Sequence, residues 1–572
     1  MAAMFLRKLT IFAAPLLLLQ GCATLPAASA PPSDAKGRVS AADPRAAEAG
    51  AAMLRQGGSA TDAAIATMLA LTVVEPQSSG IGGGGFFLRA TPDGEIATID
   101  GRETAPSGAD ERWFLDAEGK PLPFMQAVVS GLSVGVPGNI RLAEQAHARF
   151  GKLPWATLFK PAIELASGGW TLTERGREFL VRAKNRAAHQ DDLEAVFYDE
   201  SGEARPAGTL LRNRALAASL EQIARNGPDW FYTGTNAVAI ATEVAAETPR
   251  PGALTAQDIG AYQAKERRQV CGDYRGYSIC GMGPPSSGAT TVYAILKQLE
   301  RYDLAALGPR SATFWHLFAE SQRLAYADRE RYLADADFIS VPVAGLTDPD
   351  YLAARGALIS TTGTMATPQA GVPAGMTLAP PDGAEPEENG TSHFVAIDRW
   401  GDMVSYTSTI EGSFGSGIVV GGYYLNNELT DFSMVPEVDG RPVANRVEGG
   451  KRPRSSMAPT LVFDANGAPF MAVGAAGGST IPVQVARVLI GVIDFGLPLD
   501  EAVALPVLFS PGDALSIEQG TWLEDLIPQL QALGHAQVSA RGLPLKANAA
   551  LRTPAGWVGA ADPRSDGTAV SE

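Results

Sequence analysis

The chain has 572 residues, of which 45% are apolar and 19% are charged. This composition can fill a large hydrophobic core and excludes an intrinsically disordered chain. The formal net charge of -16 argues against nucleic acid as a partner, because the phosphates would be repelled, and it fits a soluble enzyme for small molecules.

The first 22 residues are predicted to be an export signal with a lipobox. Arg7 and Lys8 precede the apolar run "IFAAPLLLL", which is shorter than the ~20 residues that span a bilayer. The next residues, "LQGC", place Cys22 where bacterial lipoprotein signals carry the lipidated cysteine; the alternative is ordinary cleavage after "AASA". Residues 23–37 are rich in Ala, Pro and Ser and are expected to form a flexible tether. We expect an exported, periplasmic protein of a Gram-negative bacterium, with a lipid on Cys22 as its one link to the outer membrane.

Residues 43–75 are predicted to form two helices. The first, "DPRAAEAGAAMLRQGG", starts at Asp-Pro and stops at Gly-Gly, and the second, "SATDAAIATMLALTVV", starts at a serine cap and is apolar nearly all round. The runs "GFFLRA" and "EIATIDGRE" are then predicted strands, and residues 137–265 are mainly helical.

A hairpin is predicted in "VCGDYRGYSIC", which contains Cys271 and Cys280. An oxidising compartment would favour a disulfide between them, and two unpaired strand cysteines are the alternative. The sequence contains no CxxC or HExxH pattern, so nothing in it supports a metal site or another cofactor.

The residue pattern changes in the second half of the chain, where strand-like runs become frequent. "PPSSGATTVYAILKQLERYD" is predicted to be a loop followed by a helix, and residues 360–390 form a long exposed linker. Four strand-like runs and a helix follow: "SHFVAID", "DMVSYTST", "SMAPTLVFD", "PFMAVGAAG" and "TIPVQVARVLIGVIDFG". Central strands with flanking helices predict an α+β fold in which two packed sheets are covered by helices on both sides.

Two familiar motifs do not fit their usual contexts. Gly80, Gly82 and Gly85 satisfy GxGxxG, but a predicted helix precedes them and a strand follows, the reverse of a dinucleotide site. Their absent side chains are expected to let the backbone pass close to another segment. Ser133 satisfies GxSxG, but "VPG" follows it where a nucleophile elbow needs a helix, so a serine hydrolase is a remote alternative.

The stretch "ENGTSHF" places Thr391 directly after Asn389-Gly390. One interpretation is a hairpin turn followed by a strand. The other is a self-cut between Gly390 and Thr391, which would give Thr391 a free α-amine with a reference pKa of about 7.7–8.0. One residue would then supply both the nucleophile and the base, as in known N-terminal threonine enzymes.

The order of further motifs favours the second interpretation. "GGSATDAAIA", "GIGGGGF", "DGRETAP", "TSHF", "YTSTIEGSFGSG", "LNNELTDFS", "KRPRSSMAPT" and "GAAGGS" follow one another along the chain. Together they resemble the gamma-glutamyltransferase (gamma-glutamyltranspeptidase) family of the N-terminal-nucleophile hydrolase superfamily. The resemblance implies a four-layer αββα sandwich made of a large subunit, 38–390, and a small subunit, 391–572, which stay together as a heterodimer.

The resemblance also implies catalytic roles. Thr391 matches the nucleophile, Thr409 the residue that orients its hydroxyl, and Gly477 and Gly478 the pair whose N–H groups stabilise the oxyanion. We expect a structural role for His393, because the amine of Thr391 already serves as the base.

Six further residues match the binding site for the gamma-glutamyl donor. Its α-carboxylate would be held by Arg102, Ser455 and Ser456. Its α-ammonium would be held by three acidic residues, Glu411, Glu428 and Asp431. These residue types suit the donor, because an amino-acid zwitterion needs a cation and hydroxyls at one end and carboxylates at the other. Arg454 replaces a leucine of many relatives and is expected either to add positive charge near the carboxylate or to face solvent.

The expected function is gamma-glutamyl transfer and glutathione hydrolysis, with water or the amine of an amino acid or dipeptide as acceptor. An acylase for glutaryl or cephalosporin-type side chains would keep Thr391 but would have less need of Arg102, Glu428 and Asp431 together. A non-catalytic, peptide-binding lipoprotein would show no cut.

Overall fold

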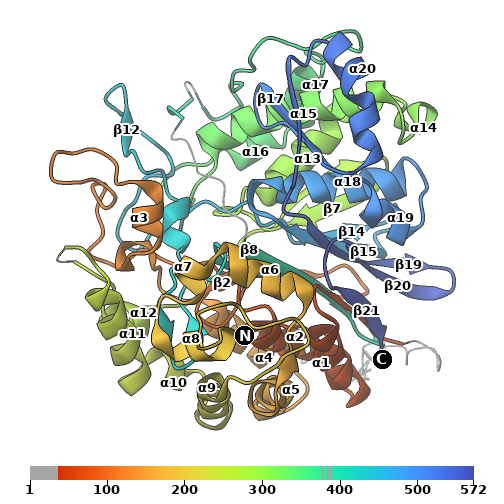
Figure 1. Ribbon diagram of the computed structural model, residues 1–572. Coiled ribbons are helices and arrows are strands. Elements are labelled where there is room, and N and C mark those ends of the chain that lie inside the picture. The colour runs from red at the N-terminus through yellow and green to blue at the C-terminus, as the bar shows by residue number, and fades with distance from the viewer. Residues whose placement is uncertain (1–35, 251, 377–378, 383–389) are drawn as a thin grey trace, which may run out of the picture.

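The structure is a computed structural model, which describes residues 36–250, 252–376, 379–382 and 390–572. Two six-stranded sheets, in which every neighbouring pair of strands is antiparallel, form the centre of the molecule (Figure 1). The first sheet has the order β21 (Thr568–Ser571), β1 (Arg38–Ala41), β8 (Gly390–Ile397), β9 (Met403–Glu411), β2 (Gly84–Ala90), β3 (Ile96–Gly101). The second has the order β20 (Gly556–Ala561), β19 (Lys546–Thr553), β15 (Pro469–Ala476), β14 (Thr460–Phe463), β7 (Tyr277–Gly281), β6 (Val270–Tyr274).

Capping residues fix the first two helices, which cover the first sheet. The Asp43 side chain accepts a hydrogen bond from the N–H of Arg45 at the start of α1 (Pro44–Arg55), and Ser59 forms a capping box with Asp62 at the start of α2 (Ala60–Val74). All 15 residues of α2 are buried, in agreement with its apolar sequence, and α2 contacts β8 and β9.

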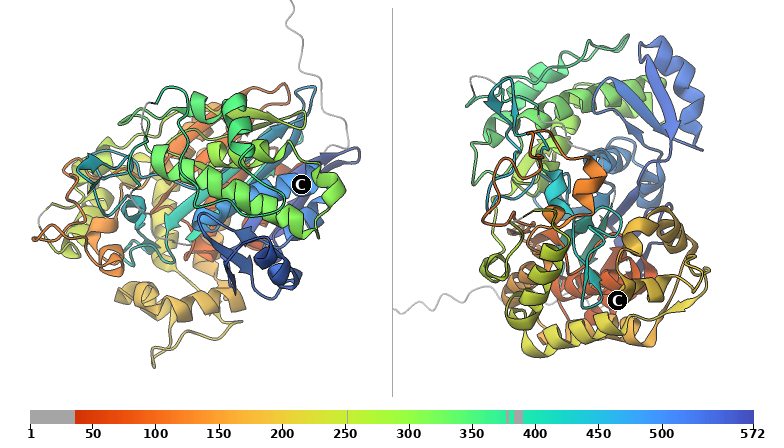
Figure 2. Two further views of the ribbon diagram at one scale, coloured as in Figure 1. Left: turned by 90° about the horizontal axis from the view of Figure 1, so that it is seen from above. Right: turned by 60° about the vertical axis from the view of Figure 1, so that its left-hand side comes forward.

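Two helices on the opposite side of the molecule, α13 (Gly288–Leu299) and α18 (Ile481–Ile493), cover the second sheet, and α15 (Ala312–Tyr332) packs against α13 (Figures 1 and 2). The two sheets contact each other through β8 and β9 on one side and β15 on the other. Hydrogen bonds also cross between them: Ser405 Oγ donates to the carbonyl of Val473 at 3.2 Å, and Asn548 Nδ2 donates to the carbonyl of His393 at 2.9 Å. The α+β class and the central position of both sheets agree with the sequence prediction.

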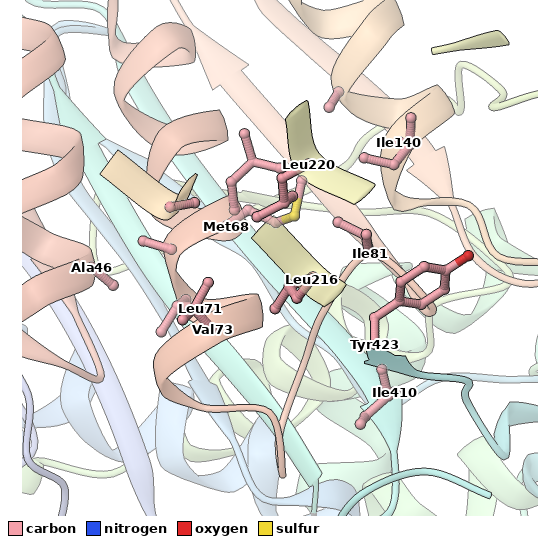
Figure 3. Close-up of a cluster of buried hydrophobic side chains, with 14 of the residues drawn as sticks. Ala46, Met68, Leu71, Val73, Ile81, Ile140, Leu216, Leu220, Ile410 and Tyr423 are labelled. Carbon is pink, nitrogen blue, oxygen red and sulfur yellow. The ribbon is translucent and has the colours of Figure 1, made fainter. Parts of the chain in front are cut away.

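The hydrophobic core consists of two large clusters. The first lies between the first sheet and its helices, and its side chains include Met68 and Leu71 of α2 packed near Leu216 and Leu220 (Figure 3). The second includes the residues between the two sheets and those beneath α13, α15 and α18.

Most of the predicted elements are present at the predicted places. The helices at 43–75, the strands that begin at Gly84 and Ile96, and the strands after Gly390 all form. Cys271 and Cys280 face each other across the β6–β7 hairpin, and their sulfurs are bonded at 2.06 Å. The long helix α15 and the C-terminal strands were not predicted.

The export signal, Cys22 and the tether up to residue 35 lie outside the described residues. Among the helices that the structure describes, none is both long and apolar enough to cross a membrane.

Candidate active site

A cavity of about 320 Å³ opens near α15, at the place where β8 begins and β9 and β15 end. Nine of the ten residues predicted for catalysis and donor binding line it: Arg102, Thr391, Thr409, Glu411, Glu428, Asp431, Ser455, Ser456 and Gly478. The tenth, Gly477, precedes Gly478 in the chain. Residues that are up to 376 positions apart, from Arg102 to Gly478, therefore meet at one place.

The Gly390–Thr391 junction lies in β8, where the pairing with β9 shifts register between these two residues. Two hydroxyls point at the carbonyl oxygen of Gly390: Thr391 Oγ1 donates to it at 2.7 Å and Thr409 Oγ1 at 2.6 Å. The two hydroxyl oxygens are 3.2 Å apart. Thr409 Oγ1 also accepts a hydrogen bond from the N–H of Glu411 at 2.8 Å, which leaves its own proton for the Gly390 carbonyl.

Position 390 has space for glycine alone. A Cβ atom there would lie 2.4 Å from the carbonyl oxygen of Glu411 and 2.7 Å from the backbone of Gly412. Gly390 therefore packs against the backbone at the end of β9, where a larger residue would force this backbone to shift.

One end of the cavity holds opposite charges in contact. The guanidinium of Arg102, which is 1% exposed, forms ion pairs with Glu428 through Nη1 and with Asp431 through Nη2. Its Nε and Nη2 also donate to the carbonyls of Pro453 at 3.2 Å and Arg454 at 2.9 Å. The backbone carbonyls and both carboxylates fix the planar guanidinium in one orientation.

Glu411 reaches the same cavity from an unusual backbone conformation. Its φ of 72° is in the left-handed region, which non-glycine residues rarely adopt. Its side chain accepts a hydrogen bond from Asn427 Nδ2, and the Asn427 Oδ1 accepts one from the N–H of Gly412 at 2.9 Å. The left-handed residue at the end of β9 thus directs a third carboxylate toward the site.

The serine pair lies on a buried segment. Ser455 Oγ accepts a hydrogen bond from the N–H of Met457 at 3.2 Å, and Ser456 Oγ accepts one from Arg329 Nη2 at 2.6 Å. Arg454 does not face solvent, so that expectation was wrong, and the expectation that it adds positive charge near the carboxylate stays a prediction. It is 1% exposed, and its Nη2 lies 2.5 Å from Glu330 Oε2.

Gly477 and Gly478 connect β15 to the 3-10 turn at the start of α18. Their φ values of 132° and 59° are left-handed, and a Cβ on Gly477 would lie 1.9 Å from the carbonyl oxygen of Pro544. The side-chain amide of Gln484 holds this turn, because it donates to the carbonyl of Ala476 at 2.8 Å and to Thr480 Oγ1 at 2.9 Å. The backbone can therefore approach a small reacting centre without side chains in between.

Sequence reasoning missed one wall of the cavity. Tyr326, Arg329 and Glu330 come from α15, and Asp382 comes from the short segment 379–382. Burial, followed by the charge of Glu330, raises the pKa of the Asp382 carboxyl. The signal that could have found this wall is "YADRERY", a concentration of charges on a helix that also carries many aromatic residues.

His393 and Ser133 do not line the cavity. His393 is buried between the sheets with its Nδ1 2.8 Å from Thr407 Oγ1, and burial lowers the pKa of the imidazole to about 3, so the ring is neutral. The Ser133 hydroxyl is buried and lies 2.8 and 2.9 Å from the carbonyls of Val128 and Ser130, to which it donates. Neither arrangement is that of a catalytic group.

The glycines of the GxGxxG motif allow close packing. A Cβ on Gly82 would lie 2.0 Å from the carbonyl of Tyr424, and one on Gly85 would lie 2.5 Å from that of Thr407. Within the described residues, no group of three or more His, Cys, Asp or Glu side chains is arranged to hold a metal ion.

The profile of a protein family described as Gamma-glutamyltranspeptidase matches residues 46–571. The chain belongs to this family. A glutathione hydrolase proenzyme of Bacillus subtilis (strain 168) is 37% identical over 515 residues, which are 87% of this chain and 85% of that protein. An acylase, the Acylase ACY 1 proenzyme of Pseudomonas sp. (strain SE83), is 34% identical over 549 residues, 95% of this chain and 94% of that protein.

A solved structure of an acylase has the same fold. The crystal structure of cephalosporin acylase from Bacillus halodurans matches with a TM-score of 0.82 and 26% identity over 97% of this chain and 99% of that chain. The chain is thus an enzyme of the gamma-glutamyltranspeptidase family with acylase relatives. The choice between the two activities depends on the cavity.

Proposed function

We propose that this chain is a gamma-glutamyltransferase and glutathione hydrolase that cuts itself between Gly390 and Thr391. The proposal includes a four-layer αββα sandwich formed by subunits 38–390 and 391–572. The observation that carries it is the meeting of Thr391, the Arg102 ion pairs and the serine pair in one cavity.

The geometry at the junction supports the self-cut. Thr391 Oγ attacks the carbonyl carbon of Gly390, and the C–N bond to Thr391 breaks while the nitrogen takes up the hydroxyl proton. Thr409 donates to the carbonyl oxygen as negative charge develops on it. Water then hydrolyses the resulting ester, which leaves Gly390 as a carboxylate and Thr391 with a free α-amine.

The same atoms then serve in turnover. The α-amine of Thr391 takes the hydroxyl proton as Oγ attacks the gamma-glutamyl carbonyl, and the N–H groups of Gly477 and Gly478 stabilise the oxyanion. The amine of the leaving group takes the proton and departs, which leaves a gamma-glutamyl ester on Thr391. Water or the amine of an amino acid or dipeptide attacks this ester and releases Thr391.

The charges in the cavity favour an amino-acid donor over a glutaryl donor. A glutaryl group has a carboxylate for Arg102 and the serines but no ammonium for Glu428 and Asp431. Its carboxylate would approach those two carboxylates without compensation, whereas a gamma-glutamyl group brings a cation.

Two measurements test the proposal. Denaturing electrophoresis should give two bands for the purified protein and one band for Thr391→Ala. The cut protein should hydrolyse gamma-glutamyl 4-nitroanilide with a kcat/KM at least about tenfold above that for glutaryl 4-nitroanilide, which corresponds to one missing charge-assisted interaction. A single band for the active protein would refute the mechanism.

The acylase activity is the second candidate, supported by the likeness to cephalosporin acylase. A preference for the glutaryl anilide would select it and leave the role of Thr391 intact. An uncut protein that turns over neither anilide would instead indicate a peptide-binding lipoprotein. We further propose an exported, periplasmic location, with a lipid on Cys22.

A further inference from the structure

Arg329 on α15 contacts Ser456 of the serine pair directly and is connected to Ser455 through Ser287. Its Nη2 donates to Ser456 Oγ at 2.6 Å, and its Nε donates to Ser287 Oγ at 2.9 Å. Ser287 in turn holds Ser455, because both its Oγ and its backbone N–H donate to the Ser455 carbonyl at 2.8 Å. The Arg329 guanidinium, which is 2% exposed, therefore contacts Ser456 directly and is linked to Ser455 through the hydroxyl of Ser287.

These contacts decide which way the serine hydroxyls can donate. A guanidinium has donors only, so Ser456 Oγ must act as the acceptor in its contact with Arg329. Ser455 Oγ likewise acts as an acceptor for the N–H of Met457. Within the described residues neither hydroxyl has another hydrogen-bond partner. Each serine thus keeps its single proton for an acceptor in the cavity, and a carboxylate is such an acceptor.

Glu330 connects Arg329 to Arg454, the residue before the serine pair. One of its carboxylate oxygens pairs with Arg329 Nη1, and the other lies 2.5 Å from Arg454 Nη2. Arg454 directly precedes the serine pair and also donates from its backbone N–H to Asn445 Oδ1 at 2.9 Å. The arginine that replaces leucine here therefore ties the serine segment to α15.

We propose that Arg329 is a positioning residue that makes Ser455 and Ser456 hydrogen-bond donors to the α-carboxylate of the gamma-glutamyl donor. Arg329 acts through the serines and sets the selectivity for that carboxylate. This inference rests on the proposed function, and it deepens the assignment of the donor site.

The test uses two anilides that differ by the α-carboxylate alone: gamma-glutamyl 4-nitroanilide and 4-aminobutanoyl 4-nitroanilide. For the wild type, kcat/KM should be higher for the gamma-glutamyl compound. In Arg329→Met this ratio should fall by about 10- to 100-fold, the effect of losing a hydrogen bond to a charged group. The fall should come from a higher KM for the gamma-glutamyl anilide, while kcat/KM for the 4-aminobutanoyl anilide stays within about twofold.

Arg355→Met is the matched control. Arg355 is also buried and packs against α15 through Asp328 and the carbonyl of Leu324, but it does not line the cavity. This variant should keep the wild-type ratio. Ser287→Ala removes only the hydroxyl that links Arg329 to Ser455, and it should lower the ratio by a smaller factor. This variant tests the proposal if Arg329→Met does not fold.

The outcomes separate the two proposals. A wild-type ratio that persists in both Arg329→Met and Ser287→Ala would overturn the role of Arg329 and leave the proposed function standing. Equal losses for both anilides would indicate a general structural role and would also overturn it. A wild type with no preference for the gamma-glutamyl anilide would overturn both proposals.

Discussion

Glu103 should make the protein less stable as the pH rises, and Glu103→Gln should remove this dependence. The side chain is 0% exposed, and neither carboxylate oxygen has a hydrogen-bond partner among the described residues. Burial raises the pKa of this carboxyl from 4.5 to about 8, even though the neighbouring Arg102 opposes the shift. The folded protein therefore holds a proton that the unfolded chain releases.

The sign and the size follow from this difference. Between pH 4.5 and about 8 the folded state binds more protons than the unfolded state, so the stability that Glu103 contributes is complete below pH 4.5 and is lost as the pH rises through 8. A shift from 4.5 to about 8, at about 1.4 kcal/mol per unit, corresponds to about 5 kcal/mol in total. Between pH 5 and pH 8 the expected loss is about 3–4 kcal/mol.

The assay is urea unfolding at pH 5 and pH 8, performed in a Thr391→Ala background so that the chain stays uncut. The wild-type residue at position 103 should give about 3–4 kcal/mol more loss of unfolding free energy over this interval than glutamine does. Because glutamine cannot ionise, other titrating groups cancel in the comparison. Parallel pH profiles for the two proteins would refute the protonated, buried state of Glu103.

Two further substitutions test the site and its remote alternative. Gly390→Ala should slow the self-cut about 100-fold, because its Cβ would meet the Glu411 carbonyl at 2.4 Å and displace the carbonyl from both hydroxyls; the fraction of uncut chain on a denaturing gel against time measures this, and a wild-type rate would contradict it. Ser133→Ala should leave gamma-glutamyl anilide turnover within about twofold and lower the unfolding free energy by about 1 kcal/mol, since its hydroxyl only donates to backbone carbonyls. Loss of turnover in a folded Ser133→Ala protein would restore the serine hydrolase alternative.

Local signals predicted β8, which carries Thr391, and the helices α1 and α2. The caps at Asp43 and Ser59 set the start of α1 and α2, and the apolar run after Gly390 set β8. The family motifs predicted that Thr391, Arg102 and the other site residues lie close together. In the structure nine of these ten residues line one cavity, although they are far apart in the sequence.

The wall formed by α15 escaped prediction because its polar residues are buried too. Glu320, Arg323, Asp328 and Arg329 are at most 4% exposed, since each has a partner inside the protein. The helix therefore lacks the alternation between an apolar and a solvated face that reveals a surface helix. The strand β19, "KANAALRT", has few residues of high β-propensity, and its place in the sheet is set by β15 and β20 on either side.

The strand order has a consequence for the fate of the two pieces. If the chain is cut after Gly390, β1, β2 and β3 belong to one polypeptide, while β21, β8 and β9 belong to the other, so the ladders β21–β1, β1–β8 and β9–β2 all join different polypeptides. In the second sheet the β14–β7 ladder does the same. Neither fragment by itself would possess an intact sheet, so each depends on the other to complete both sheets.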